Sequence, residues 1–238
     1  SRFFMQALSF EKKNFISTEP FQGLFTQGMV CHETYKDENN RWLSPEEVFT
    51  DNGKDFFKIK DKKKILVGPP ESMSKSKRNT IDPEKIMDQY GADAVRFTLS
   101  SMAAMGRDLR LSTDRVIGYR NFGTKIWNAA RYAQLNNCES STNFNPDTVT
   151  NSINKWIIFQ TTDLKKEVDS ALETFRFNDA ANIIYQFSWA TFCDWYLEFT
   201  KPLLANSEDV LLKETRATTS WVLKQIFNSL NPLMPYIT

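Results

Sequence analysis

The residues best suited to chemistry form one short polar stretch, residues 71–79, in which three cations stand among small hydroxyl residues. The cations are Lys75, Lys77 and Arg78. Ser74 and Ser76 flank the first of them. Lysine ammonium groups can follow the charge of a polyphosphate as it develops in a transition state, and serine hydroxyls add hydrogen-bond donors without bulk. The stretch therefore predicts a mobile clamp for phosphate groups, although basic loops are common and charge alone is a weak signal.

Other kinds of catalytic or metal site lack the residues they need. His32 is the only histidine, so a multi-histidine zinc site is excluded and a catalytic triad would depend on one residue. His32 could be a ligand beside Cys31 and Glu33, but a surface or strand-end histidine is the commoner case. The three cysteines are far apart, which fits neither a disulfide framework nor paired zinc spacing. We expect no metal site formed by the chain itself.

Composition indicates a folded, non-membrane protein. The 238 residues are 41% hydrophobic and include 19 Phe and 6 Trp, which is enough apolar surface for a packed core. No apolar run approaches the roughly 18 residues that cross a bilayer, and the first residues do not resemble a secretory signal. A net charge of +1 means that any nucleic-acid surface must be local. We expect a cytoplasmic monomer with no membrane partner.

The elements before the loop are predicted from short patterns. The chain opens with apolar residues at helical spacing, and Phe21–Val30 follows as a strand whose glycines would allow close approach of another backbone. Asp37–Asn40 is a polar turn that predicts a hairpin or a small excursion of the chain. Phe56–Gly68 reads as two short strands around a basic turn, where the lysines are more simply a solvated face. The loop should therefore follow a small group of strands.

Beyond the loop the apolar period is helical throughout. Asp82 is suited to cap a helix that begins at Pro83, Gly91 should end that helix, and Gly106 marks a break. A loop is expected over residues 136–151. The further expected helices cover residues 114–137, 153–175, 178–204 and 209–230. Such amphipathic segments favour an all-helical bundle.

One face of the helix at 114–137 is polar and partly basic. Its members recur at helical spacing and are Arg120, Thr124, Asn128 and Arg131. They could contact a nucleic-acid backbone, whereas composition alone favours a solvated helix face. Four tryptophans lie among apolar neighbours and are expected to pack in the core rather than to stack on bases: Trp127, Trp156, Trp189 and Trp195.

The full string around the loop is far more specific than its charge. Met73–Lys77, followed by Asn79-x-Ile-Asp-Pro and Tyr90-Gly-Ala-Asp93, resembles the Lys-Met-Ser-Lys-Ser signature of class I aminoacyl-tRNA synthetases. The resemblance implies that Lys75 stabilises the pyrophosphate leaving from ATP, while Ser74 and Ser76 shape the loop. It further implies that Met73, Lys75 and Lys77 hold the ATP phosphates, with ATP and Mg²⁺ as cofactors of the complete enzyme.

Two departures from the family pattern bear on activity. Ser72 stands where the signature has its first lysine, so we expect impaired adenylate formation. The family's other signature, His-x-Gly-His, needs two histidines and this sequence has one. We therefore expect the first ATP-binding half to be missing and the chain by itself not to aminoacylate tRNA.

The two parts of the chain resemble different synthetases. Residues 1 to about 96 resemble leucyl-tRNA synthetase, for example in Leu24–Val30 and His32–Lys36, whereas residues from about 97 resemble valyl-tRNA synthetase, for example in Lys125–Arg131 and Asp194–Glu198. The switch falls near a Tyr-Gly-Ala-Asp segment similar in both relatives. We favour a chimera of the two; the alternative is one divergent enzyme.

The resemblance also implies a fold and a partner. The expected fold is an α/β remnant of a Rossmann-type class I catalytic domain at 1–82, connecting helices at 83–112 and a helical anticodon-binding domain at 113–238. The residues expected to contact a tRNA of valine or leucine type are Arg110, Arg120, Lys125 and Arg131. The first hypothesis is a fragment of a valine- or leucine-type tRNA ligase, with the valine type favoured for the anticodon domain. The alternatives are a non-catalytic tRNA-binding module and a sequence artefact.

Overall fold

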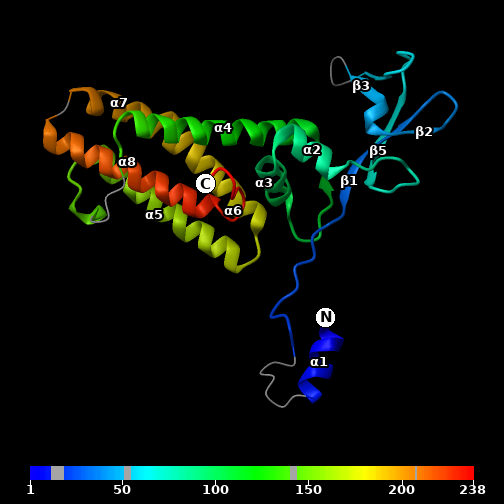
Figure 1. Ribbon diagram of the computed structural model, residues 1–238, viewed down its shortest axis with the longest axis horizontal. Helices are drawn as coiled ribbons and strands as arrows, with labels where there is room; N and C mark the ends of the chain where they lie inside the picture. The colour runs from blue at the N-terminus through cyan, green and yellow to red at the C-terminus, as the bar shows by residue number, and fades with distance from the viewer. Residues whose placement is uncertain (12–18, 51–54, 140–143, 207) are drawn as a thin grey trace.

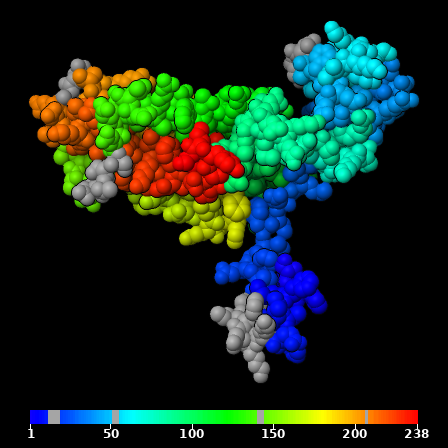
Figure 2. All heavy atoms as spheres, viewed as in Figure 1, coloured from blue at the N-terminus to red at the C-terminus, as the bar shows by residue number. Residues whose placement is uncertain are grey.

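The computed structural model describes residues 1–11, 19–50, 55–139, 144–206 and 208–238. Figure 1 shows three parts: a long helical bundle, a small strand-rich module beyond one end of the bundle, and a short helix that stands apart at the N-terminus. That helix, α1 (Arg2–Glu11), buries none of its residues, and Figure 2 shows it as a lobe on a narrow neck of chain. None of the helices in the described ranges is long and apolar enough to cross a membrane.

The strand-rich module contains two small sheets. In the larger sheet β2 (Trp42–Leu43), β1 (Val30–Lys36) and β5 (Leu66–Ser72) lie in that order and are antiparallel, while β6 (Leu109–Arg110) runs parallel to β1. The other sheet pairs β3 (Val48–Thr50) with β4 (Phe56–Lys58) after the short 3₁₀ helix η1 (Pro45–Glu47). Tyr35, Leu43 and Ile65 form the small buried core of this module.

The expected hairpin is confirmed, because Tyr35 pairs with Leu43 across the 37–40 turn. The two strands expected within 56–68 are present as β4 and β5, but they pair with β3 and β1. The strand expected over Phe21–Val30 is wrong, since only Val30 belongs to β1 and the preceding chain makes a single isolated bridge, Gln27 with Met105.

A close approach between the backbones of Gly28 and Arg107 explains why the strand expected over Phe21–Val30 does not form. A Cβ at Gly28 would lie 1.9 Å from the carbonyl oxygen of Arg107, and the amide of Met29 donates to Asp108 Oδ1 at 2.9 Å. This chain is therefore held against the 105–108 turn rather than in a sheet ladder. The expectation that glycines here allow close approach is confirmed at Gly28.

Two short helices join the module to the bundle. α2 (Pro83–Tyr90) begins as predicted, because Asp82 Oδ1 accepts from the amide of Glu84 at 3.0 Å. Gly91 ends α2 with a φ of 89° and opens α3 (Ala92–Met102), and the break at Gly106 has a φ of 70°. Such positive φ values favour glycine. Phe97 of α3 is fully buried in the bundle core.

The bundle is formed by long helices, as predicted. They are α4 (Thr113–Leu135), α5 (Ser152–Glu173), α6 (Phe177–Gln186), the π-helix η3 (Phe187–Tyr196), α7 (Leu197–Asn206) and α8 (Asp209–Leu230); the 3₁₀ turn η2 (Pro146–Thr148) lies between α4 and α5. The uniform helix expected over 178–204 is therefore wrong in its middle, where ten residues have π-helical geometry. The predicted fold class is confirmed: an α/β part precedes an all-α bundle.

The tryptophans divide into two groups. Trp156 and Trp189 are partly buried and pack against the bundle core, as expected. Trp127 and Trp195 are 62% and 59% exposed, so the expectation that they pack in the core is wrong. Each immediately neighbours a buried residue, Ile126 or Tyr196, and a neighbouring position on a helix points about 100° away. Apolar neighbours in sequence therefore did not imply apolar neighbours in space.

Candidate functional site

The cationic loop connects β5 to α2. Ser72 is the last residue of β5 and pairs with Cys31 of β1, and the amide of Met73 donates to the carbonyl of Val30 at 3.2 Å. Residues 74–80 then turn away from the sheet before α2 starts at Pro83. The loop is therefore anchored to the sheet at one end and to a capped helix at the other.

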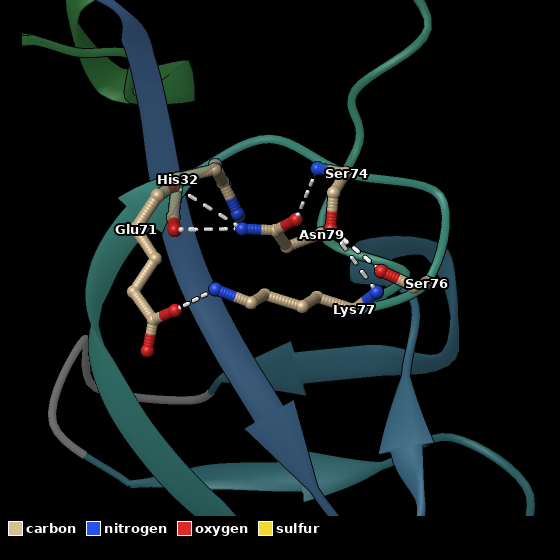
Figure 3. A network of polar contacts seen from close by, with 6 residues as sticks. All are labelled: His32, Glu71, Ser74, Ser76, Lys77 and Asn79. Carbon is tan, nitrogen blue, oxygen red and sulfur yellow. Dashed lines mark hydrogen bonds and ion pairs between the residues drawn. The ribbon is translucent and has the colours of Figure 1, made fainter.

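Asn79 organises the interior of the loop and is fully buried. Its Oδ1 accepts from the amide of Ser74 at 2.9 Å, and its Nδ2 donates to the carbonyls of His32 at 3.3 Å and Glu71 at 3.2 Å (Figure 3). One amide side chain therefore joins the start of the loop to β1 and β5. Because buried polar groups are costly unless paired, this arrangement favours one loop conformation.

The two serines expected to shape the loop contact each other. Ser74 Oγ and Ser76 Oγ are 3.1 Å apart, and the amide of Lys77 donates to Ser74 Oγ at 3.3 Å. Arg78 has a φ of 54°, and its amide donates to the carbonyl of Lys75 at 3.2 Å, which closes a tight turn. The backbone thus presents Lys75 at the exposed tip of this turn.

The three cations of the loop have different surroundings. Lys77 Nζ forms an ion pair with Glu71, as Figure 3 shows, and Arg78 Nη2 lies 3.1 Å from Glu47 Oε2. Lys75 is exposed and makes no ion pair with any residue in the described ranges. Lys75 is consequently the cation of this loop most available to an anionic ligand. Since Lys77 is already neutralised, it does not replace the charge absent at Ser72.

His32 contributes its backbone to the loop. Its carbonyl accepts from Asn79, while its ring Nδ1 lies 3.0 Å from the carbonyl oxygen of Glu33 and its ring packs edge-on against Tyr35. Within the part of the chain that the structure describes, no three His, Cys, Asp or Glu side chains gather as metal ligands would. His32 is half-buried inside β1, where it pairs with Glu71, so the expected surface or strand-end position is wrong, although its contacts are structural.

The polar face predicted on α4 is present. Arg120, Thr124, Asn128 and Arg131 are all exposed. The opposite face, which includes Phe122 and Ile126, is buried in the core. The exposed Trp127 lies on α4 among these polar residues, between two hollows. One hollow, about 300 Å³, includes Arg120 in its lining, and the other, about 600 Å³, includes Arg131; Trp127 lines both.

The other two residues expected to contact tRNA lie elsewhere. Lys125 forms an ion pair with Asp194, and its Nζ is 3.8 Å from the centre of the Trp189 ring, so it links α4 to η3. Arg110 is exposed on β6 at the strand-rich module. Arg120 and Arg131 therefore share one exposed face of α4 with Trp127, whereas Lys125 of the same helix contacts η3 and Arg110 lies on β6.

Two family models match the regions just described. The model described as the anticodon-binding domain of tRNA ligase matches residues 154–238, and the model described as tRNA synthetases class I (I, L, M and V) matches residues 65–112, which contain the loop. The chain belongs to the class I aminoacyl-tRNA synthetases. The resemblance drawn from the loop signature is therefore confirmed.

Relatives of this synthetase chain are similar over most of its length. Valine--tRNA ligases from Nitrobacter winogradskyi and Rhodopseudomonas palustris are each 50% identical over 166 residues, and that from Cereibacter sphaeroides is 52% identical over 168 residues. Each alignment covers 70% of this chain but only 17% of the relative. The synthetase chain therefore spans about one sixth of the length of these relatives.

A solved synthetase shows the same fold. The crystal structure of LeuRS from Agrobacterium radiobacter K84, in a ternary complex with tRNA and LeuAMS, matches all of this chain with a TM-score of 0.63 and 20% sequence identity. The match covers 24% of that chain. At this identity the similarity concerns the fold of the synthetase chain.

Sequence reasoning missed three functional candidates in this synthetase chain. Asn79 was noticed only as part of the signature, and Glu71 was not recognised as the partner of Lys77. Trp127 was assigned to the core although it is exposed. The available signal was the helical spacing of the four polar residues around Trp127, because residues on one helix face carry the residue between them outward. These four are Arg120, Thr124, Asn128 and Arg131.

Proposed function

We propose that this chain is the tRNA-binding part of a valine-type aminoacyl-tRNA ligase. The observation that carries the proposal is the exposed face of α4, where Arg120 and Arg131 lie on either side of Trp127. The match of residues 154–238 to an anticodon-binding domain and the identity of about 50% to valine--tRNA ligases support it. The second candidate is the leucine type, which the resemblance of residues 1 to about 96 favours.

The chemistry of this face suits an RNA loop. Arginine guanidinium groups contact phosphates through charge-assisted hydrogen bonds, and an exposed indole ring can stack on an unpaired base. The hollows of about 300 and 600 Å³ beside Trp127 leave room for groups on both sides of the ring. We expect the arginines to supply salt-dependent affinity and Trp127 to supply a preference for unpaired bases.

The test is the salt dependence of tRNA binding. Replacing both Arg120 and Arg131 with Ala should weaken binding of valine tRNA and lower the slope of log affinity against log salt by about 2, or about 1 per lost phosphate contact. A charge-matched control replaces Lys165 and Lys213, which are exposed on α5 and α8, with Ala and should leave the slope unchanged. Equal binding of valine tRNA, leucine tRNA and an unrelated RNA by the unaltered chain would refute a tRNA-recognition function.

The loop supports a second part of the proposal, the handling of ATP phosphates in the complete ligase. Lys75 is exposed and has no ion pair with a residue that the structure describes, which fits an anionic ligand, and the buried Asn79 fixes the backbone from which Lys75 projects. Lys75 would hold the negative charge of the departing pyrophosphate, and Ser74 and Ser76 would keep the turn tight. Mg²⁺ bound with ATP would share in neutralising the phosphates.

Pyrophosphate exchange with valine or leucine, in a complete ligase that contains this segment, tests the loop. Lys75→Ala should lower the exchange rate by about 10²–10³, the usual effect of removing one group that stabilises transition-state charge. Ser72→Lys should raise the rate, because it restores a charge that Lys77, paired with Glu71, does not supply. An unchanged rate for Ser72→Lys would contradict this assignment.

The alternative function, a tRNA-binding module without catalysis, differs in one result. It requires tRNA binding that depends on Arg120 and Arg131, with no exchange activity in any form of the protein that the source produces.

The chimera hypothesis is tested separately, by resequencing the source DNA across the codons for residues 90–100. A continuous sequence obtained from a single DNA molecule would exclude misjoined reads.

A further inference from the structure

A groove separates α5 from the helical wall formed by α6 and η3, away from the polar face of α4. Its volume is about 460 Å³. Gln160, Asp163 and Glu167 line it from α5, and Asn182, Gln186 and Thr191 line it from the opposite wall. The groove therefore offers amide and carboxylate groups along its length.

Both walls continue into aromatic residues. Trp156 lies four residues before Gln160 on α5, and Trp195 lies four residues after Thr191 on η3, so each is about one helical turn further along the same face. Phe199 joins the two walls at this end, because its ring centre is 6.4 Å from that of Trp156 and 5.7 Å from that of Trp195. Three aromatic rings thus lie together about one helical turn beyond the groove.

Two of these rings are accessible to a partner. Trp195 is 59% exposed and Phe199 is 41% exposed, and Phe159, which directly precedes Gln160 on α5, is 62% exposed. The π-helical geometry of η3 contributes to the exposure of Trp195, because an extra residue per turn changes the direction in which the following side chains point. Turns of π-helix also occur frequently at functional sites. Exposed aromatic rings grouped around a hollow are typical of an interaction surface.

The negative charge of the groove favours a cationic partner. Asp163 and Glu167 are the titratable side chains of its described lining, which contains no lysine or arginine. Lys166 Nζ is 3.9 Å from Asp163 Oδ1, at the limit of an ion pair, and Glu167 has no ion pair with a residue in the described ranges. An RNA phosphate would be repelled here. A guanidinium or ammonium group would find carboxylates for ion pairing and aromatic faces for cation–π contact.

We propose that this groove is a docking site for a basic protein segment, a helix that carries arginine or lysine residues on one face. Its cations contact Asp163 and Glu167, and its terminal part packs against the rings of Trp195 and Phe199. The groove and the polar face of α4 then have opposite preferences: α4 attracts the RNA backbone through Arg120 and Arg131, and the groove attracts cationic protein. The proposal is independent of tRNA binding, because it uses neither α4 nor the loop at 73–80.

Fluorescence anisotropy of a labelled synthetic helix tests the proposal with the whole chain. The probe is a 16-residue alanine-based peptide with three arginines at four-residue spacing, and its partner probe has glutamate at the same three positions. We expect the arginine probe to bind and the glutamate probe not to bind. The double variant Asp163→Asn/Glu167→Gln should weaken binding at least tenfold, and Trp195→Ala should weaken it about fivefold.

A matched control separates the groove from general electrostatics. Asp169→Asn/Glu173→Gln removes the same charge from exposed positions of the same helix outside the groove, and it should leave binding unchanged. Circular dichroism confirms that each variant keeps its helices. Equal losses in the two double variants, binding of the glutamate probe, or a Trp195→Ala variant that loses RNA binding instead of peptide binding would each overturn the proposal.

Discussion

At the scale of single residues, Glu214 of α8 holds the start of α5. Its carboxylate accepts from the amide and hydroxyl of Thr150 at 2.8 and 2.7 Å, from the amide of Asn151 at 3.0 Å and from Asn154 Nδ2 at 3.0 Å. Burial raises the pKa of Glu214, but these hydrogen bonds together lower the pKa by more than burial raises it. The pKa therefore lies below the usual glutamate range. The charged carboxylate therefore stabilises the folded state.

Glu214→Ala should lower the free energy of unfolding at pH 7 by about 2 kcal/mol, through the loss of charge-assisted hydrogen bonds. Because the folded pKa is depressed, the stabilisation is complete above the unfolded pKa of about 4.3 and is lost as the pH falls through the folded value. Urea denaturation at pH 7 and pH 3 should therefore show a smaller difference between variant and parent at pH 3. A difference that does not change with pH would contradict this account.

At the scale of elements, the loop and α2 share a boundary. The carboxylate of Asp82 satisfies the amide of Glu84 in the first turn of α2, and Asn79 fixes the loop three residues before that cap. The side chain of Asn79 donates hydrogen bonds from the loop to backbone carbonyls of β1 and β5. The loop tip is thus held between two fixed points, although it projects from the sheet.

Asp82→Ala should destabilise the chain by about 1 kcal/mol, the usual effect of losing an N-cap. It should also speed hydrogen exchange at the amide of Glu84, since that amide loses its acceptor. Asp88→Ala is the matched control, because Asp88 is exposed inside the same helix and makes no cap; its stability should change by no more than about 0.5 kcal/mol. Urea denaturation and amide exchange measured by mass spectrometry provide the two readouts.

At the scale of the whole molecule, α3 attaches the connecting helices to the C-terminal segment that follows α8. Asp93 accepts from the amides of Tyr236 and Ile237 at 3.1 and 2.8 Å, and Arg96 donates to the carbonyls of Pro232 and Leu233 at 2.8 and 3.3 Å. Both side chains come from α3 and both partners follow α8. These hydrogen bonds add to the packing of Phe97 of α3 in the bundle core.

Asp93→Ala should release Tyr236 and Ile237 from α3, while Arg96 still holds residues 232 and 233. We expect loss of exchange protection at the amides of Tyr236 and Ile237 and a destabilisation of about 1–3 kcal/mol, because two amides lose a charged acceptor. Asp93→Asn keeps one acceptor oxygen and should be intermediate. Unchanged protection of both amides in Asp93→Ala would show that the segment is held by packing alone.

Local signals in the sequence were reliable where structure depends on a few neighbouring residues. The cap at Asp82 and the breaks at Gly91 and Gly106, both of which have positive φ, are predictable because they act within one turn of the chain. The polar face of α4 followed from its period, and the loop signature indicated the family. The boundaries of most helices agree with prediction for the same reason.

The tertiary structure decided what depends on residues that meet only after folding. Gly28 lies against the backbone of Arg107, which replaced an expected strand by a close contact with a distant turn. Asn79 became the organiser of the loop because the carbonyl of His32, far away in sequence, lies within its reach. Trp127 of α4 and Trp195 of η3 are expected in the core from the sequence, but both are exposed. The direction of a helix and its π-helical geometry determine which of its faces meets the core.

The same distinction applies to the charges of the loop. The sequence determined that three cations stand at 75, 77 and 78, but only the folded chain shows that Glu71 neutralises Lys77 and that Glu47 pairs with Arg78. Lys75 is left exposed at the turn. An ion pair depends on the distance between two charged atoms, and the strand pairing that sets this distance is not visible in the order of the residues.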